Sequence, residues 1–218
     1  MQLIIGNKAY SSWSLRPWLL LRHFAVPFEE RVIALDTPTF HGSIGALSPS
    51  RRVPALHHDE VIVWDSLAIC EYVNEVFLEG RGWPASRATR AIARAVVAEM
   101  HSGFAALRSE CPMNVRRRLT AALPLSDAAA RDVARVAELW RDCRARFGQG
   151  GPFLFGTFSI ADAFYAPVAT RLRTYAQPLG AVEAAYVEAI HQLPAMQQWV
   201  ADAQREPERL EKYETIGG

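Results

Sequence analysis

Cysteine is scarce in this chain of 218 residues, which holds only Cys70, Cys111 and Cys143. These three lie far apart and include no Cys-x-x-Cys pair. So few, widely spaced cysteines argue against a disulfide framework and against a zinc site. No apolar run approaches the ~18 residues of a membrane-spanning helix, and the first residues lack the features of a signal peptide. Lysine and arginine together number 24 and acidic residues 23, which gives a net charge of +1. So small a net charge gives no indication of nucleic-acid binding. We therefore expect a cytoplasmic protein with no bound metal, no membrane contact and no nucleic-acid partner.

Half of the residues are hydrophobic, and the first 78 alternate between strand and helix patterns. Short apolar and β-branched runs bounded by turn residues predict strands, whereas apolar residues at three- and four-residue steps predict helices. The expected strands span residues 2–5, 28–35, 53–57 and 61–64, and the expected helices 15–24, 40–47 and 67–77. This order implies a parallel crossover followed by a hairpin and a helix, which is the arrangement of a thioredoxin-like domain.

Beyond residue 78 no strand pattern remains. A Gly- and Pro-containing linker is expected at 79–87, and helices follow over 88–108, 126–147, 159–175, 182–191 and 194–205. Residues 212–218 have the polar composition of a partly loose tail. The predicted fold is thus an α+β, thioredoxin-like domain of residues 1–78 (βαβ-ββα) joined to an all-α helical-bundle domain of residues 88–218.

A hydroxyl cluster lies between the first strand and the first helix, at residues 11–16, Ser-Ser-Trp-Ser-Leu-Arg. Free backbone N–H groups and the helix dipole favour negative charge at such a position. An anion suits it, and so does a thiol that must react as a thiolate. The same serines can also act only as helix caps, and this segment alone does not decide between these roles.

Two further segments have the features of a ligand site. Pro54 enters a predicted strand to whose ladder it cannot donate, and a cis bond there turns the backbone of Val53 outward, free to pair with an extended peptide. Ser66 begins a predicted helix, where its hydroxyl and backbone N–H suit a carboxylate, while Asp65 suits an ammonium group. An ordinary strand-initial proline and an ordinary helix cap are the alternatives.

A capping box, Ser159-x-x-Asp162, begins the predicted helix over 159–175. Phe158 precedes it and can act as a hydrophobic staple. We interpret this motif as structural.

These motifs, in this order and with a change of domain near residue 85, resemble the cytosolic glutathione transferases along nearly the whole chain. Val53-Pro54 is similar to their cis-proline loop, residues 65–69 to the segment that holds the γ-glutamyl end of glutathione, and residues 159–162 to their buried capping box. Residues 11–16 are similar to the Ser-Ser-x-Ser-x-Arg signature of the zeta class, which includes maleylacetoacetate isomerases.

The resemblance implies an enzyme that activates its co-substrate glutathione for conjugation to, isomerisation of, or reduction of a small electrophile. It implies that Ser12 stabilises the glutathione thiolate with Ser11 beside it. Arg16, four residues on, either adds positive potential or pairs with an acid. Tyr10 is the second candidate for the thiolate partner, because other classes use a tyrosine near the first strand.

Two departures leave the exact class open. Trp13 stands where the signature often has Cys, and Arg52 where relatives often have Gln or Lys. Residues 148–172 and 51–54 also resemble a bacterial branch tied to thiol-dependent peroxide reduction. At the far end of glutathione, the resemblance implies that Arg52 or His41 binds the glycyl carboxylate.

The pocket for the second substrate is expected to include the apolar residues Trp13, Met113 and Tyr165, for which packing in the core is the alternative. It is also expected to include Arg171 or Arg173, for which a solvated helix face is the alternative. The resemblance also implies a homodimer, to which the helices over 67–77 and 88–108 contribute. A non-catalytic binding or regulatory protein of the same fold is the alternative function. A disulfide reductase is disfavoured because no cysteine lies in the first 69 residues.

Overall fold

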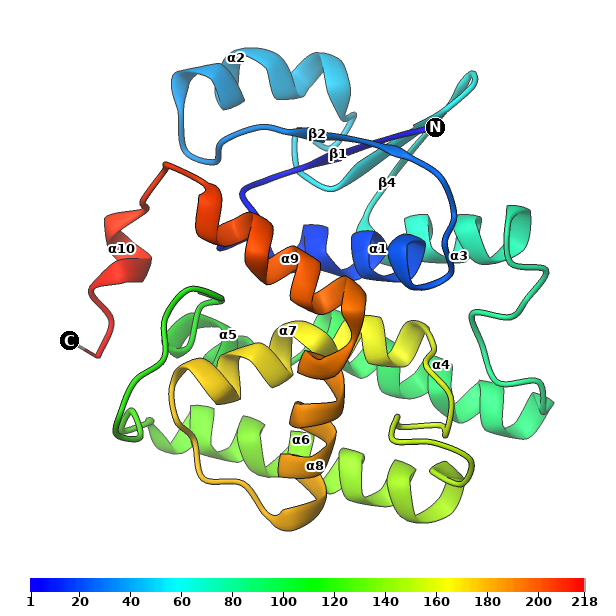
Figure 1. Ribbon diagram of the computed structural model, residues 1–218, viewed down its shortest axis with the longest axis vertical. Coiled ribbons are helices and arrows are strands. Elements are labelled where there is room, and N and C mark those ends of the chain that lie inside the picture. The colour runs from blue at the N-terminus through cyan, green and yellow to red at the C-terminus, as the bar shows by residue number, and fades with distance from the viewer. Residues whose placement is uncertain (218) are drawn as a thin grey trace.

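The computed structural model describes residues 1–217 and places a small sheet domain on a bundle of helices (Figure 1). The first part contains β1 (Gln2–Ile5), α1 (Ser12–His23), β2 (Glu29–Val32), α2 (Pro38–Leu47), β3 (Ala55–His58), β4 (Val61–Trp64) and α3 (Ser66–Val76). The second part contains α4 (Arg87–Ser102), α5 (Ala105–Glu110), α6 (Asp127–Phe147), α7 (Ile160–Thr174), α8 (Ala181–Gln192), α9 (Pro194–Arg205) and α10 (Glu211–Glu214). A thioredoxin-like domain followed by an all-α domain is thereby confirmed.

The sheet has the strand order β2-β1-β3-β4. β1 pairs in parallel with β2, and it pairs antiparallel with β3, which forms a hairpin with β4. In Figure 1, α2 covers one side of the sheet while α1 and α3 lie between the other side and the helical domain. The alternation of side chains along β1 fits these two layers, because Leu3 and Ile5 join the core around α1, whereas Ile4 packs with Ile33 and Ala55 on the α2 side.

One cluster of buried side chains extends from the sheet through α1 into the helical domain. Its centre is α7, in which every residue from Ile160 to Leu172 is buried. A helix that is apolar or small-sided on all faces belongs in the interior, and α7 packs against α1, α4 and α8. A polar side chain between Ile160 and Leu172 therefore points either into the core or into a site.

The predicted capping box holds the start of α7. Asp162 Oδ2 accepts hydrogen bonds from the Ser159 amide (2.9 Å) and hydroxyl (3.0 Å). Its Oδ1 accepts from the Leu154 amide (3.0 Å) and the Tyr186 hydroxyl (3.1 Å). Asp162 thus ties three segments together while fully buried.

Several predicted boundaries differ from the structure, and the three largest or best explained differences are at α1, β2 and α4. α1 begins at Ser12 rather than at residue 15, because the Ser11 Oγ caps it by accepting from the Ser14 amide (3.4 Å). β2 is shorter than predicted, because Thr37 closes a turn onto the Ala34 carbonyl and then caps α2. The single helix expected over 88–108 is two helices, α4 and α5, separated by Gly103 and Phe104.

The break between α4 and α5 has a local cause. A Cβ atom on Gly103 would lie 2.7 Å from the Glu99 carbonyl oxygen, and Phe104 takes the left-handed conformation with φ 57°. Both features end the regular helix.

The expectation of a loose tail is wrong for the residues that the structure describes. Lys212 Nζ lies 2.5 Å from Asp36 Oδ2, and Arg117 donates to the Ile216 carbonyl (2.9 Å). Gly218 lies outside the described residues. Within residues 1–217, no helix combines the length and the apolar character needed to cross a bilayer.

Candidate functional site

The three serines at the start of α1, Ser11, Ser12 and Ser14, make different contacts. The Ser11 hydroxyl donates to Ser14 Oγ (2.7 Å), and Ser14 Oγ accepts from the Gly6 amide (3.2 Å). Both of these serines therefore hold the loop to the helix. Ser12 is the first residue of α1 and is 7 % exposed, and it takes no part in these contacts.

Ser12 meets an arginine from the other domain. Arg171 Nη2, on α7, donates to Ser12 Oγ at 3.1 Å, while Nη1 donates to the Cys111 and Arg108 carbonyls. Because a guanidinium can only donate, the Ser12 oxygen is the acceptor and its hydrogen is free to donate elsewhere. Burial, followed by the charge of Arg108, lowers the pKa of Arg171 to about 10, so this arginine stays charged at neutral pH.

Ser12 opens onto a hollow of about 370 Å³ at the junction of the two domains. Its lining comes from the start of α1, the loops before α2 and β3, α2, α5 and the segment after it, α7 and the tail: Tyr10, Ser11, Ser12, Trp13, Leu35, Phe40, Arg51, Arg52, Val53, Arg108, Pro112, Met113, Arg171 and Tyr213. An adjoining hollow of about 390 Å³ is lined by Trp13, Ser50, Arg52, Val53, Pro54, Trp64, Asp65 and Ser66. The three predicted segments therefore meet at one continuous surface.

The second hollow ends at the start of α3. Asp65 caps this helix, because its Oδ1 accepts from the Leu67 amide (2.7 Å). The φ angle of Asp65 is 75°, a conformation that costs a non-glycine residue ~1–3 kcal/mol and is frequent at functional sites. Ser66 follows, fully buried. Between Ser12 and Ser66, the Val53–Pro54 peptide bond is cis.

Arg16 joins the two ends of this site from within the core. It is 1 % exposed, and its guanidinium lies over the rings of Trp13 (4.1 Å) and Phe164 (4.6 Å). Arg16 Nη1 donates to Ser66 Oγ (3.1 Å) and to His101 Nδ1 (3.3 Å). Burial, with the charges of Arg108 and Arg171, lowers its pKa to about 9. Arg16 thus holds Ser66 and His101 and makes no direct ion pair with an acid among the described residues.

Among the residues not foreseen from the sequence, two carry basic side chains. His101, on α4, places Nε2 3.2 Å from Asp65 Oδ2. Arg108, on α5, lies over the Trp13 ring at 4.8 Å. Neither belongs to a motif, and the packing of α4 against α7 and of α5 against α6 brings them to the site.

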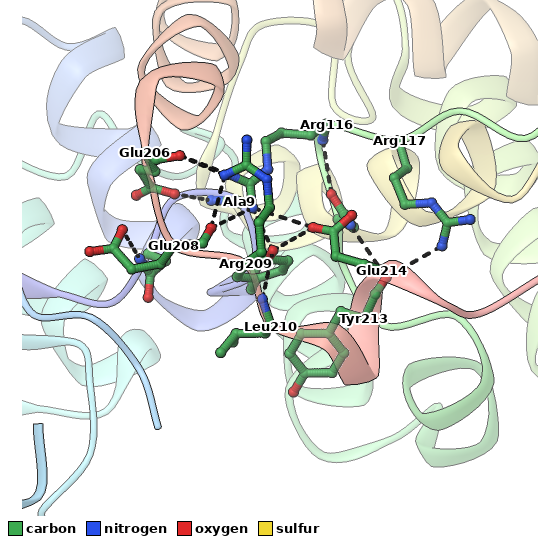
Figure 2. A network of polar contacts seen from close by, with 12 residues as sticks. Ala9, Arg116, Arg117, Glu206, Glu208, Arg209, Leu210, Tyr213 and Glu214 are labelled. Carbon is green, nitrogen blue, oxygen red and sulfur yellow. Dashed lines mark hydrogen bonds and ion pairs between the residues drawn. The ribbon is translucent and has the colours of Figure 1, made fainter. Parts of the chain in front are cut away.

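The tail engages Tyr10, the second candidate for the thiolate partner. The Tyr10 hydroxyl donates to the Glu214 carboxylate and accepts from the Arg116 guanidinium and the Leu210 amide. Figure 2 shows Arg116, Leu210 and Glu214 converging in this network. Burial and the Glu214 hydrogen bond raise the pKa of Tyr10. Its hydroxyl therefore already has both a donor and an acceptor within the tail.

Some of the expected pocket residues reach the site and others do not. Trp13 and Met113 line the hollow beside Ser12. Tyr165 is instead a core residue that donates to the Val96 carbonyl (3.3 Å). Arg173 lines a separate hollow of about 490 Å³. The reason is helical phase, since two residues along an α-helix turn a side chain by about 200° away from the face of Arg171.

His41 is exposed on α2, and its ring packs against Phe40. It is absent from the lining of both hollows within the described residues, whereas Arg52 lines both.

The three cysteines are buried. Burial raises the pKa of Cys111 to about 11 and that of Cys143 to about 12, and it also raises the pKa of Cys70. None of these thiols is ready to react as a thiolate at neutral pH, which weakens further the case for cysteine-based chemistry.

Two family models match the chain. The N-terminal domain of glutathione S-transferase matches residues 10–76, and the C-terminal domain of glutathione S-transferase matches residues 126–202. This chain belongs to the glutathione S-transferase family. The predicted family and the predicted enzyme class, a glutathione transferase, are thereby confirmed.

Solved structures agree with this assignment. A glutathione transferase homolog from Burkholderia gl BGR1, solved with bound glutathione, is 26 % identical with a TM-score of 0.70, covering 94 % of this chain and 98 % of its own. A bacterial maleyl pyruvate isomerase of the zeta class is 20 % identical with a TM-score of 0.72, over 96 % and 100 %. A diazinon-metabolizing transferase of the silkworm Bombyx mori is 15 % identical with a TM-score of 0.71, over 95 % and 98 %. The last two establish the fold alone. No curated protein matches the sequence.

Proposed function

We propose that this glutathione transferase binds glutathione along the two adjoining hollows, with the sulfur at Ser12 and the γ-glutamyl end at Asp65 and Ser66. The observation that carries the proposal is the contact between Arg171 and Ser12. Arg171 occupies the Ser12 oxygen at 3.1 Å, which leaves the hydroxyl hydrogen as a donor at the N-terminus of α1. The Burkholderia relative, which binds glutathione, supports the choice of ligand.

In this mechanism Ser12 lowers the pKa of the glutathione thiol without becoming a nucleophile itself. A free thiol has a pKa of about 8.5, and the thiolate is the reactive form. A hydroxyl donor, the N-terminus of α1 and the nearby Arg171 charge all stabilise the thiolate. Each unit of pKa corresponds to about 1.4 kcal/mol, so one hydrogen bond of ordinary strength accounts for about one unit.

The other groups hold the peptide. The backbone of Val53 has no hydrogen-bond partner among residues 1–217 and can pair with the cysteinyl backbone of glutathione. Arg52 lines both hollows, which supports it as the residue that binds the glycyl carboxylate, and we prefer it to the exposed His41.

For the second substrate we propose an electrophile with a negative charge. The hollow beside Ser12 is lined by four arginines, Arg51, Arg52, Arg108 and Arg171, and by no acidic residue of the described part of the chain, 1–217. If Arg52 serves glutathione, Arg51, Arg108 and Arg171 remain for the substrate. Arg171 Nε is buried and has no partner within residues 1–217. Conjugation, isomerisation and reduction all remain compatible with a thiolate at this place.

We also propose a cytoplasmic homodimer. The edge strand β4 and helix α3 expose large apolar side chains, namely Val61, Ile62, Trp64 and Val76. An edge strand that exposes several apolar residues favours association with another chain. Analytical ultracentrifugation tests this, and a 24 kDa species at micromolar concentration would contradict it.

The Ser12→Ala variant tests the assigned mechanism. We expect the apparent pKa of the bound thiol to rise by about one unit and kcat/KM near pH 6.5 to fall about tenfold. The measurement is the pH profile of kcat/KM for a chlorinated dinitrobenzene, together with thiolate absorbance of the complex. Ser12→Thr, which keeps the hydroxyl, is the matched control. An unchanged thiol pKa in Ser12→Ala would contradict the role of Ser12.

A further inference from the structure

His101 connects three elements at the Asp65 end of the site. It lies near the end of α4, where its Nδ1 meets Arg16 of α1 at 3.3 Å and its Nε2 meets Asp65, the cap of α3, at 3.2 Å. Its ring packs edge-on to Trp13 (5.2 Å) and near Phe164 (5.9 Å). Nothing in the proposed mechanism uses this residue.

The partners of His101 determine which of its nitrogens carries the proton. Arg16 can only donate, so Nδ1 must offer its lone pair, and the hydrogen of the neutral ring must then sit on Nε2. From Nε2 it points at Asp65 Oδ2, which can only accept when ionised. The neutral ring therefore accepts a hydrogen bond from the Arg16 guanidinium at Nδ1 and donates one to the Asp65 carboxylate from Nε2.

The same contacts fix both anchors of the γ-glutamyl end. Asp65 uses Oδ1 for the Leu67 amide, and Oδ2 faces His101. Arg16 Nη1 is shared between His101 and Ser66 Oγ. Removing the His101 ring nitrogens frees Oδ2 of Asp65 and releases one of the two acceptors that orient Arg16.

We propose that His101 is a positioning residue for the glutathione site, which as the neutral Nε2–H ring links Arg16 to Asp65 and so holds Ser66 and Asp65 in register for the γ-glutamyl group. The inference rests on the proposed binding of glutathione. His101 does not touch the reacting sulfur, which lies at the other end at Ser12. Its loss should therefore weaken binding without changing the reaction step.

Acid should break this link. Protonation puts a hydrogen on Nδ1, where it opposes the Arg16 guanidinium and ends the hydrogen bond. The charged groups facing the ring are Arg16 from α1, Arg108 from α5 and Asp65 from α3, and burial together with the two arginines outweighs Asp65 and lowers the pKa of His101. A lowered pKa means that the neutral ring, and the link, are present at neutral pH and are lost as the pH falls through the folded-state value.

The test is calorimetric titration of S-methylglutathione, whose blocked sulfur removes thiol ionisation from the measurement, between about pH 5 and pH 8. His101→Asn keeps an acceptor near Nδ1, and His101→Gln keeps a donor near Nε2, but neither side chain supplies both or titrates. For each we expect Kd about tenfold higher than wild type at pH 7.5, the effect of one hydrogen bond to a charged group. We also expect the wild-type rise in Kd toward pH 5 to be absent from both variants, with kcat at saturating glutathione within about twofold.

The matched control is His191→Gln. His191, on α8, is another histidine whose pKa burial lowers, and it lines the hollow that contains Arg173. This variant should keep both the Kd and its pH dependence. Wild-type affinity and pH dependence in both His101 variants would overturn the proposal for His101 alone, whereas wild-type protein that binds no S-methylglutathione or glutathione at millimolar concentration would overturn the proposed function.

Discussion

The buried carboxylate of Asp162 gives the sharpest stability prediction. The Asp162→Ala variant removes the acceptor of four hydrogen bonds, two from the backbone amides of Leu154 and Ser159 and two from the hydroxyls of Ser159 and Tyr186. The hydroxyls can rotate toward other acceptors. The amides cannot, because the chain around α7 fixes them in a buried place.

The magnitude follows from these two amides. A buried N–H group left without an acceptor costs ~1–3 kcal/mol, so the pair amounts to ~2–6 kcal/mol. Domains of ordinary stability unfold with ~5–15 kcal/mol. We therefore expect Asp162→Ala to lose about 4 kcal/mol of unfolding free energy, a large part of the total.

Urea unfolding followed by tryptophan fluorescence measures this loss. The midpoint should fall while the slope m stays unchanged. Asp127→Ala is the comparison, since Asp127 is exposed in the first turn of α6 and supports that helix mainly through its dipole, worth about 0.5 kcal/mol. A loss below about 1 kcal/mol in Asp162→Ala, with the same m, would refute the reasoning from unpaired amides.

Three further predictions concern Tyr10, Arg108 and the titration of Asp162. Tyr10→Phe should keep kcat/KM within about twofold, because Glu214 and the rest of the tail already engage the hydroxyl; a loss of about a hundredfold in the same assay would restore Tyr10 as the thiolate partner. Arg108→Ala should raise KM about tenfold for a carboxylate-bearing chloronitrobenzene but not for its neutral analogue, whereas Arg173→Ala should leave both values unchanged. Burial raises the pKa of Asp162 to about 6, so this group's contribution to folding is greatest below its ordinary pKa and declines as the pH rises toward 6; urea midpoints across that range should fall more for wild type than for Asp162→Asn, and parallel curves would contradict this.

Local signals were enough to predict where several residues of the candidate site lie along the helices and strands. A helix start is readable from residues within one turn, and so Ser11 and Ser12, and likewise Asp65 and Ser66, were predicted at helix N-termini where the structure has them. A proline before a short strand likewise pointed to the Val53–Pro54 bond. Each of these features depends on a few neighbouring residues, which one sequence contains.

Features that depend on packing between distant segments were not readable. Arg171 and Arg173 are two residues apart in the same predicted helix, and only the rotation of α7 against α1 decides which of them meets Ser12. His101 ends up at the site through the packing of α4, and Arg108 lies on α5, beyond the Gly103–Phe104 break in what the Ala-rich pattern predicts as one helix. Helical periodicity predicts which face of a helix is apolar, but it does not predict which other element packs against that face.

The contact between Arg171 and Ser12 makes the candidate site depend on how the two domains pack against each other. The hydroxyl of Ser12 is oriented by a guanidinium that starts on the other domain, so any shift of α7 relative to α1 changes the 3.1 Å contact. Asp162 fixes the first turn of α7, nine residues before Arg171, to two other segments. Because α7 is a continuous buried helix between them, the capping box that stabilises the fold also sets the place of the donor to Ser12. Partial loss of this cap should therefore raise the pKa of a bound thiol before the protein unfolds, and a destabilised but folded Ser159→Ala variant is the one in which to look for it.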